Sequence, residues 1–137
     1  METYTLEHCG NSIMIYNLNY SDLDAKAGNP YNTTLDIKVV SGLFSGVCNC
    51  EYDMSELVIF AREVNEMYEF RRQEVRFNDI CYGSWINFEM NKIGHLFIKG
   101  EIYGTGMTHV LKFEFYADQS SLKHFADSLK RLVTDET

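Results

Sequence analysis

Residues 94–133 read GHLFIKGEIYGTGMTHVLKFEFYADQSSLKHFADSLKRLV, and this stretch decides the fold. Apolar residues alternate with polar ones on both sides of a glycine-rich segment, which predicts two antiparallel strands joined by a tight turn. A two-residue turn at Gly104 and Thr105 would place both apolar sets on one face of the sheet. It predicts four cross-strand pairs: Ile102 with Met107, Gly100 with His109, Ile98 with Leu111, and Leu96 with Phe113.

After Phe115 the apolar period lengthens from two residues to about 3.6, which predicts an amphipathic helix after the second strand. Asp118 or Ser120 is expected to cap the first turn of this helix. The apolar face of the strand pair therefore has a helix to pack against. The apolar stripe of the helix consists of Leu122, Phe125, Ala126, Leu129, Leu132 and Val133.

The first half of the chain has a similar pattern. Residues 11–18 and 33–40 alternate, and residues 43–52 are expected to form a hairpin with the second of these strands. Gly46, in the middle of that hairpin, predicts a bulge or the close approach of another element. Asp53 is expected to cap a helix with the apolar stripe Leu57, Phe60, Ala61, Val64, Met67 and Tyr68.

Two further strands, residues 73–80 and 84–90, precede the stretch quoted above and extend it into a four-stranded meander. Gly94 is expected in the left-handed conformation at the end of a three-residue turn that aligns Met90 with Leu96. The sequence therefore predicts an α+β fold with mostly antiparallel sheet, about seven strands and two amphipathic helices.

Composition favours one soluble globular domain over residues 1–137. Hydrophobic residues make up 45% of the chain and aromatic residues 14%, which is enough for one sizeable core. The apolar runs are shorter than the ~20 residues that a membrane span needs. The N-terminal segment has neither the basic nor the apolar part of a secretory signal, so we expect a cytoplasmic protein.

The formal net charge of −8 restricts the choice of partner. A strongly acidic protein repels the phosphates of nucleic acid, so a nucleic-acid-binding role is disfavoured. The same charge favours a basic protein as partner. Acidity that serves solubility alone is the competing explanation.

No catalytic motif stands out, and we expect no cofactor or metal. The four cysteines lack a CxxC pair, so reduced thiols are expected, with Cys48 and Cys50 on one face of a strand. Asp22 and Asp24 lack the glycine and terminal glutamate of a calcium loop. Only His109 among the histidines is predicted to face inward, as a hydrogen-bonded core residue. A small-molecule-binding protein or enzyme with a pocket near His109 is the alternative.

Two exposed features are candidates for contact with a partner. Ile59 lies opposite the apolar stripe of the first helix, next to Glu63 and Glu66. An exposed apolar residue surrounded by acids suits a basic protein partner, and coverage of Ile59 by another element is an equal alternative. Residues 19–32 lack any period and are expected to form a long contact loop. The candidate residues in this loop are Tyr20, Asp22, Asp24 and Tyr31.

Four segments together resemble the WapI-like immunity proteins of bacterial toxin systems: LDIKVVSGLFSG (35–46), SELVIFAREVNEM (55–67), GHLFIKGEIY (94–103) and DQSSLKHFADSLKRL (118–132). The resemblance implies a small cytoplasmic protein that binds and neutralises the C-terminal domain of a cognate toxin, often a nuclease. It implies no catalytic residues, and it agrees with an acidic surface facing a basic toxin. A plain structural subunit is a third hypothesis, and the sequence leaves the oligomeric state open.

Overall fold

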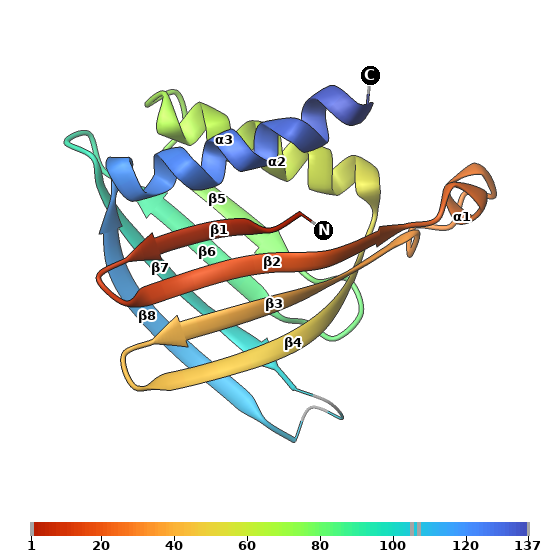
Figure 1. Cartoon of the computed structure of the whole chain (residues 1–137), viewed down its shortest axis with the longest axis horizontal. Helices are drawn as coiled ribbons and strands as arrows, with labels where there is room; N and C mark the ends of the chain where they lie inside the picture. Colours follow the sequence, from red (N-terminus) through yellow and green to blue (C-terminus); the bar gives the residue numbers. More distant parts are fainter. Residues whose placement is uncertain (1, 105, 107, 137) are drawn as a thin grey trace.

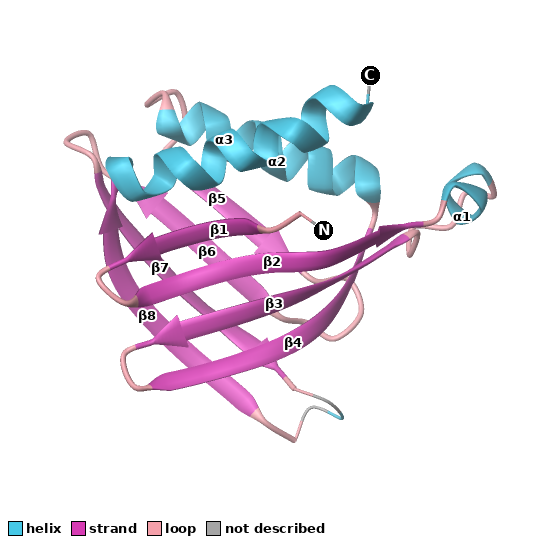
Figure 2. Ribbon diagram, in the orientation of Figure 1, coloured by secondary structure: helices cyan, strands magenta, loops and turns pink. Residues whose placement is uncertain are grey.

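The computed structural model describes residues 2–104, 106 and 108–136, and Figures 1 and 2 show its eight strands and three helices. The fold is α+β, as predicted, with one strand and one short helix more than expected. The elements are, in chain order, β1 (Tyr4–His8), β2 (Asn11–Tyr20), α1 (Asp22–Lys26), β3 (Thr33–Ser41), β4 (Phe44–Tyr52), α2 (Met54–Tyr68), β5 (Glu74–Asn78), β6 (Trp85–Met90), β7 (His95–Tyr103), β8 (Val110–Asp118) and α3 (Gln119–Glu136).

The strands form two antiparallel sheets, one in the order β1-β2-β3-β4 and the other in the order β5-β6-β7-β8. The second sheet is the predicted meander. Figure 2 shows the first sheet lying across the second, with the two strand directions crossing, and α2 and α3 lying over the open end between them. The inward faces of both sheets and of both long helices share one hydrophobic core. None of the helices in the described residues has the length and apolar character needed to cross a membrane.

Alternation along the strands decides which side chains enter the core. Cys48 and Cys50 point inward from β4 and are both buried, on the same face as predicted. Gly46 causes no bulge, but it is a point of close approach between the sheets. A Cβ atom at Gly46 would lie 3.3 Å from Ile102 Cδ1 and 3.4 Å from Leu111 Cδ2. The start of β4 therefore packs directly on β7 and β8.

Both long helices begin at the predicted caps. The Asp53 carboxylate accepts a hydrogen bond from the backbone N–H of Ser55 at 3.0 Å, and that of Asp118 accepts one from Ser121 at 2.8 Å. The apolar stripes predicted for the two helices are buried or half-buried. At the centre of the core, the Phe60 ring of α2 lies 6.3 Å from the Phe125 ring of α3.

The pairing of β7 with β8 differs from the predicted register. Gly100 pairs with Phe113 instead of with His109, so β8 is displaced by four residues relative to the prediction. Because the displacement is an even number, the same faces still point inward. Of the turn predicted here, Thr105 lies outside the described residues, as does Met107.

The observed register is explained by the space above Gly100. A Cβ atom at Gly100 would lie 2.9 Å from Phe113 Cζ and 2.4 Å from the Trp85 backbone oxygen. The Phe113 ring thus fills the space that was assigned to His109. His109 itself precedes β8, has an exposed side chain, and accepts a backbone hydrogen bond from Gly104 at 2.8 Å. The prediction of an inward-facing core histidine at position 109 was wrong.

Candidate functional site

Residues 19–32, here called the arm, project from the body of the protein between β2 and β3 (Figure 1). The pairing of β2 with β3 shifts between Tyr16 and Asn19, and Asn17 at the shift has a positive φ of 54°. The Asn17 side chain donates a hydrogen bond to Asp36 at 2.8 Å, which fixes this irregularity. Such a bulge bends the strand pair, so the end of β2 is redirected away from the sheet.

A short helix, α1, forms the tip of the arm where the sequence predicted only a loop. Ser21 caps it by accepting a hydrogen bond from the Asp24 backbone N–H at 3.2 Å. Gly28, with φ of 79°, reverses the chain after the helix. No residue of α1 is buried, so the helix has no apolar stripe that a search for periodicity could detect.

Asn32 anchors the base of the arm to the start of α2. Its side chain is 5% exposed and donates hydrogen bonds to the Asn29 carbonyl at 3.0 Å and to Asp53 Oδ1 at 3.2 Å. The side-chain oxygen Oδ1 of Asn32 accepts one from the Met54 backbone N–H at 2.9 Å. Burial opposes ionisation of Asp53, but hydrogen bonds from Ser55 and Asn32 outweigh it, and the pKa of Asp53 is lowered. The arm and α2 are therefore held by one hydrogen-bond network.

The arm contains the four residues that were predicted from this segment as candidates for partner contact: Tyr20, Asp22, Asp24 and Tyr31. Both tyrosines are more than 40% exposed. The structure adds Leu23, which is 81% exposed between the two aspartates and which the sequence analysis missed. The position of this leucine between two acidic residues, in a segment without apolar periodicity, is the sequence feature that could have identified it. A hollow of about 280 Å³ separates the arm from the first turn of α2.

The negative charge of the protein is concentrated in the part of the chain that includes the arm. Residues 1–53, which contain the first sheet and the arm, have seven acidic and two basic side chains and so carry −5 of the total −8. One of the two bases, Lys26, donates to Asp22 at 2.9 Å within α1. A basic partner would therefore be attracted mainly to the first sheet and the arm.

The other candidate residues lie on a different element, the outer face of α2. Ile59 is 42% exposed there, but Glu63 and Glu66 are ion-paired rather than free. Arg72 lies 3.1 Å from Glu63 and 3.3 Å from Glu66, and Arg71 lies 3.9 Å from Glu66. This face therefore presents much less negative charge than its glutamates alone suggested.

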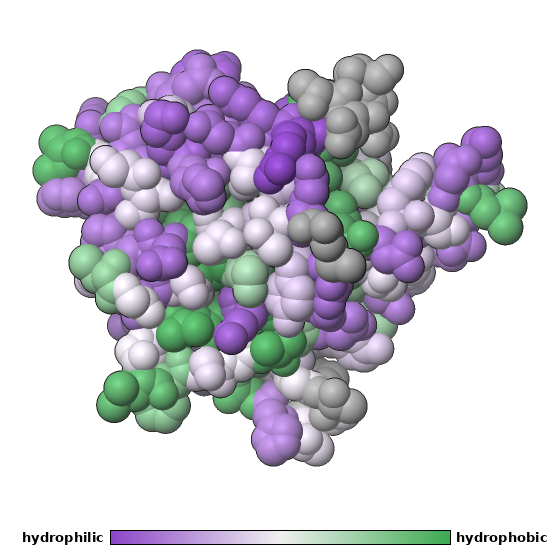
Figure 3. All heavy atoms as spheres, in the orientation of Figure 1, coloured by the Kyte–Doolittle hydropathy of each residue, from purple (hydrophilic) through white to green (hydrophobic). Residues whose placement is uncertain are grey.

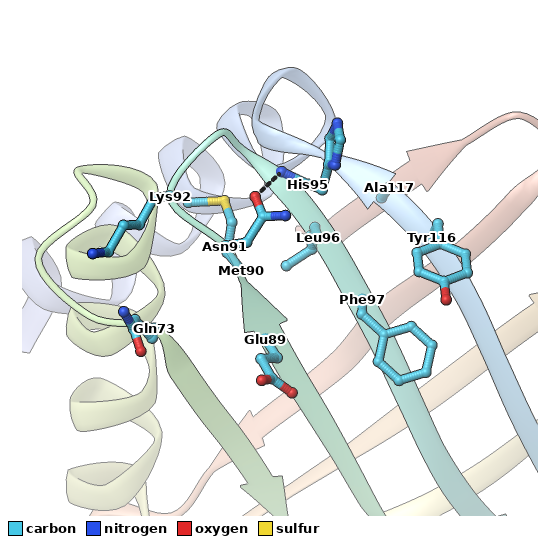
Figure 4. A pocket seen from close by; sticks show the side chains of 10 residues that line it. All are labelled: Gln73, Glu89, Met90, Asn91, Lys92, His95, Leu96, Phe97, Tyr116 and Ala117. Atoms are coloured by element: carbon cyan, nitrogen blue, oxygen red, sulfur yellow. Dashed lines mark hydrogen bonds between the residues drawn. The ribbon is translucent and has the colours of Figure 1, made fainter.

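A hollow of about 730 Å³ lies on the outer face of the second sheet, beside the turn between β6 and β7 (Figure 4). The Phe97 and Tyr116 rings line it from neighbouring strands, with their centroids 5.0 Å apart. Asn91 shapes its rim by accepting a hydrogen bond from the His95 backbone N–H at 3.0 Å. This hollow was not predicted from the sequence, because Phe97 and Tyr116 become neighbours only in the observed register.

A further hollow of about 390 Å³ lies between β4 and the segment that follows β7, lined in part by Asp36, Tyr82 and Tyr103. His109 is not among its described lining residues. Within the described part of the chain, no three His, Cys, Asp or Glu side chains are grouped so that they could hold a metal ion.

Comparison with known proteins identifies the family. The model of the Immunity protein WapI-like family matches residues 7–135, a range that includes both sheets almost completely, the arm and both long helices. No curated protein matches the chain. Because the match covers nearly the whole sequence, the chain belongs to the WapI-like immunity protein family.

Proposed function

We propose that this protein neutralises the C-terminal domain of a cognate toxin by binding it and covering its active site or substrate groove. Membership of the WapI-like immunity protein family is the observation that carries this proposal. According to this proposal, the protein acts in the cytoplasm as a stoichiometric inhibitor and not as an enzyme. A basic toxin domain, such as a nuclease that must hold nucleic acid, fits the charge of −8.

The arm is the proposed toxin-binding surface. It projects from the body, so it can enter a groove on the toxin, and the hydrogen bonds at its base hold it in place before binding. Tyr20 and Tyr31 are exposed, and tyrosine is among the residues that supply most of the binding energy in protein interfaces. Leu23 adds an exposed apolar side chain that a partner could bury. Asp22 and Asp24 beside them suit basic groups on the toxin.

The face of α2 around Ile59 is the second candidate surface, and its charges predict a different behaviour. Glu63 and Glu66 both form ion pairs with arginines, whereas in the arm Asp22 pairs with Lys26 and no ion pair of Asp24 is found among the described residues, so the two glutamates are the more neutralised pair. Replacing both by Gln should change the association rate less than replacing Asp22 and Asp24 by Asn. The paired substitutions remove the same formal charge, so each serves as the control for the other.

Protection of cells from the toxin tests the proposed function. The cognate toxin domain, which this proposal expects a neighbouring gene to encode, is expressed in bacteria with the wild type, with Leu23→Asp, or with Ile93→Asp as control. Ile93 is 75% exposed and lies in the turn between β6 and β7, away from the arm. We expect protection by the wild type and by Ile93→Asp, and its loss with Leu23→Asp. If the wild type gives no protection, the proposed function is wrong; if Leu23→Asp protects fully, the arm is not the binding surface.

A further inference from the structure

The outer edge of β8 is free for strand pairing. Alternate residues of β8 bond to β7, and the same ladder continues at both ends, where Gly104 N–H donates to His109 O at 2.8 Å and Gln119 N–H donates to Gly94 O at 2.9 Å. In an antiparallel ladder the intervening residues direct their backbone groups away from the neighbouring strand. On β8 these residues are Val110, Lys112, Glu114, Tyr116 and Asp118.

These backbone groups have no strand beside them, since β8 is the last strand of its sheet. Among the described residues, no backbone hydrogen bond to Lys112, Glu114 or Tyr116 is formed from outside the β7–β8 ladder. The opposite edge strand, β5, has five residues and packs against α2, whereas β8 has nine. α3 and strands of the first sheet also pack against β8, but none of them forms a backbone hydrogen bond with Lys112, Glu114 or Tyr116 among the described residues. A long uncovered edge is a template for pairing with another strand.

Exposed apolar residues lie near this edge. β4 crosses the second sheet from Tyr52, whose ring stacks at 4.7 Å on Phe77 of β5, to Gly46, which contacts Leu111 of β8. The turn that precedes β4 therefore lies on the β8 side of the protein, and apolar side chains gather there in Figure 3. They include Leu43, which is fully exposed, and Phe44, which is 71% exposed.

We propose that β8 pairs with β8 of a second copy of this chain, antiparallel and across a two-fold axis at Phe113. In this register Lys112 of each copy lies opposite Glu114 of the other, and Val110 opposite Tyr116. Opposite charges and apolar pairs at directly facing positions stabilise strand pairs. The same patch thus meets itself in a complementary way, as a two-fold interface requires.

Other registers are less favourable. An axis at Lys112 or at Glu114 would place like charges face to face. An axis closer to the end of β8 would use Asp118, which already accepts hydrogen bonds from Ser121 and lies 4.0 Å from His8. Lys112 and Glu114 balance each other along this edge, so the contact itself adds no repulsion to that between two copies that each carry −8. The arm takes no part, and the inference is independent of the proposed function.

Light scattering coupled to size-exclusion chromatography, over a range of protein concentrations, tests the pairing. We expect the wild type to approach twice the 15.9 kDa mass of the chain. Lys112→Glu and Glu114→Lys should each weaken the dimer at least tenfold, because each places like charges face to face at two symmetric positions. The double variant Lys112→Glu/Glu114→Lys should restore the dimer, because it re-creates both opposite-charge pairs.

If only charge contacts within one copy mattered, the double variant should be weaker than either single variant, not stronger. Lys112 lies opposite Glu101 and Glu114 opposite Lys99 in the pairing of β7 with β8, so the double variant combines two unfavourable contacts inside each copy. Rescue by the double variant therefore distinguishes pairing between copies from a loss of folding, and melting curves accompany each sample. A monomeric wild type, single variants that dimerise like the wild type, or a double variant weaker than both single variants would each overturn the proposal. The proposal would also be overturned if the wild type were monomeric and Lys112→Glu or Glu114→Lys weakened binding of the toxin domain, because the edge would then bind the toxin and not a second copy.

Discussion

The substitution Asn32→Ala tests whether one buried side chain holds the arm to the body. The amide of Asn32 takes part in four hydrogen bonds, two donated to Asn29 and Asp53 and two accepted from Thr33 and Met54. A typical hydrogen bond contributes about 1 kcal/mol net to stability. Asp53 lies close enough to solvent for water to replace part of the loss, so we expect a decrease of about 2 to 3 kcal/mol in the free energy of unfolding.

Urea unfolding followed by the fluorescence of Trp85, the one tryptophan of the chain, measures this decrease. Hydrogen exchange at the Ser21 amide, which donates to the Asn32 carbonyl at 2.8 Å, reports on the arm itself and should become faster. Asn29→Ala is the matched control. Asn29 is half-buried and its side chain accepts one hydrogen bond, from the Tyr31 N–H, so its loss should cost about 1 kcal/mol or less. Equal effects of the two substitutions, or unchanged exchange at Ser21, would refute the anchoring role of Asn32.

Two further predictions concern the fold. Gly100→Ala should lower the free energy of unfolding in urea by more than about 2 kcal/mol, because the added Cβ atom would meet the rigid backbone oxygen of Trp85. Gly46→Ala should cost less than about 1 kcal/mol, because its nearest neighbours are the flexible ends of Ile102 and Leu111, and similar costs for the two substitutions would contradict the observed register. Hydrogen bonds lower the pKa of both cap residues, Asp53 and Asp118, so the stability that they contribute is complete above about pH 4 and is lost as the pH falls through their folded-state pKa values. Replacing either cap by Asn, which also caps helices, should flatten the decrease in melting temperature below pH 4, and an unchanged acid profile would count against these caps.

Local sequence signals were sufficient for the two long helices, α2 and α3, and for the turn before β7. Each long helix has a capping aspartate followed by an apolar stripe, and these signals lie within a few residues of each other. Gly94 has the expected positive φ, of 88°, and Met90 pairs with Leu96 as predicted. β1 was missed, because only Tyr4 and Leu6 alternate inward over its short length.

The register of β7 with β8 could not be predicted, because alternation determines only which face of a strand is buried. Displacing β8 along β7 by any even number of residues keeps the same face buried, and the glycine-rich segment between the strands allows more than one turn. The packing of Phe113 on Gly100 selects among them, and that contact joins residues from different strands. The same limit applies to the proposed dimer, whose register depends on which residues of β8 face outward.

The candidate binding surfaces were predictable in part. The exposure of Ile59 follows from its place opposite the apolar stripe of α2. The pairing of Glu63 and Glu66 with Arg72 does not follow from helical spacing, because Arg72 lies beyond the end of α2. The chain reverses at Phe70, which has a φ of 61°, and this reversal brings Arg72 back beside the helix.

The kinetics of binding to the purified toxin domain test the central claim most directly. Surface plasmon resonance at two salt concentrations compares the wild type with Leu23→Ala, with the pair Asp22→Asn and Asp24→Asn, and with Glu63→Gln/Glu66→Gln. We expect Leu23→Ala to speed dissociation by an amount equivalent to about 1 to 2 kcal/mol. The aspartate pair should slow association and flatten its salt dependence more than the glutamate pair does. Wild-type rates for both arm variants would contradict docking through the arm, and a wild type that does not bind the toxin domain would contradict the immunity function itself.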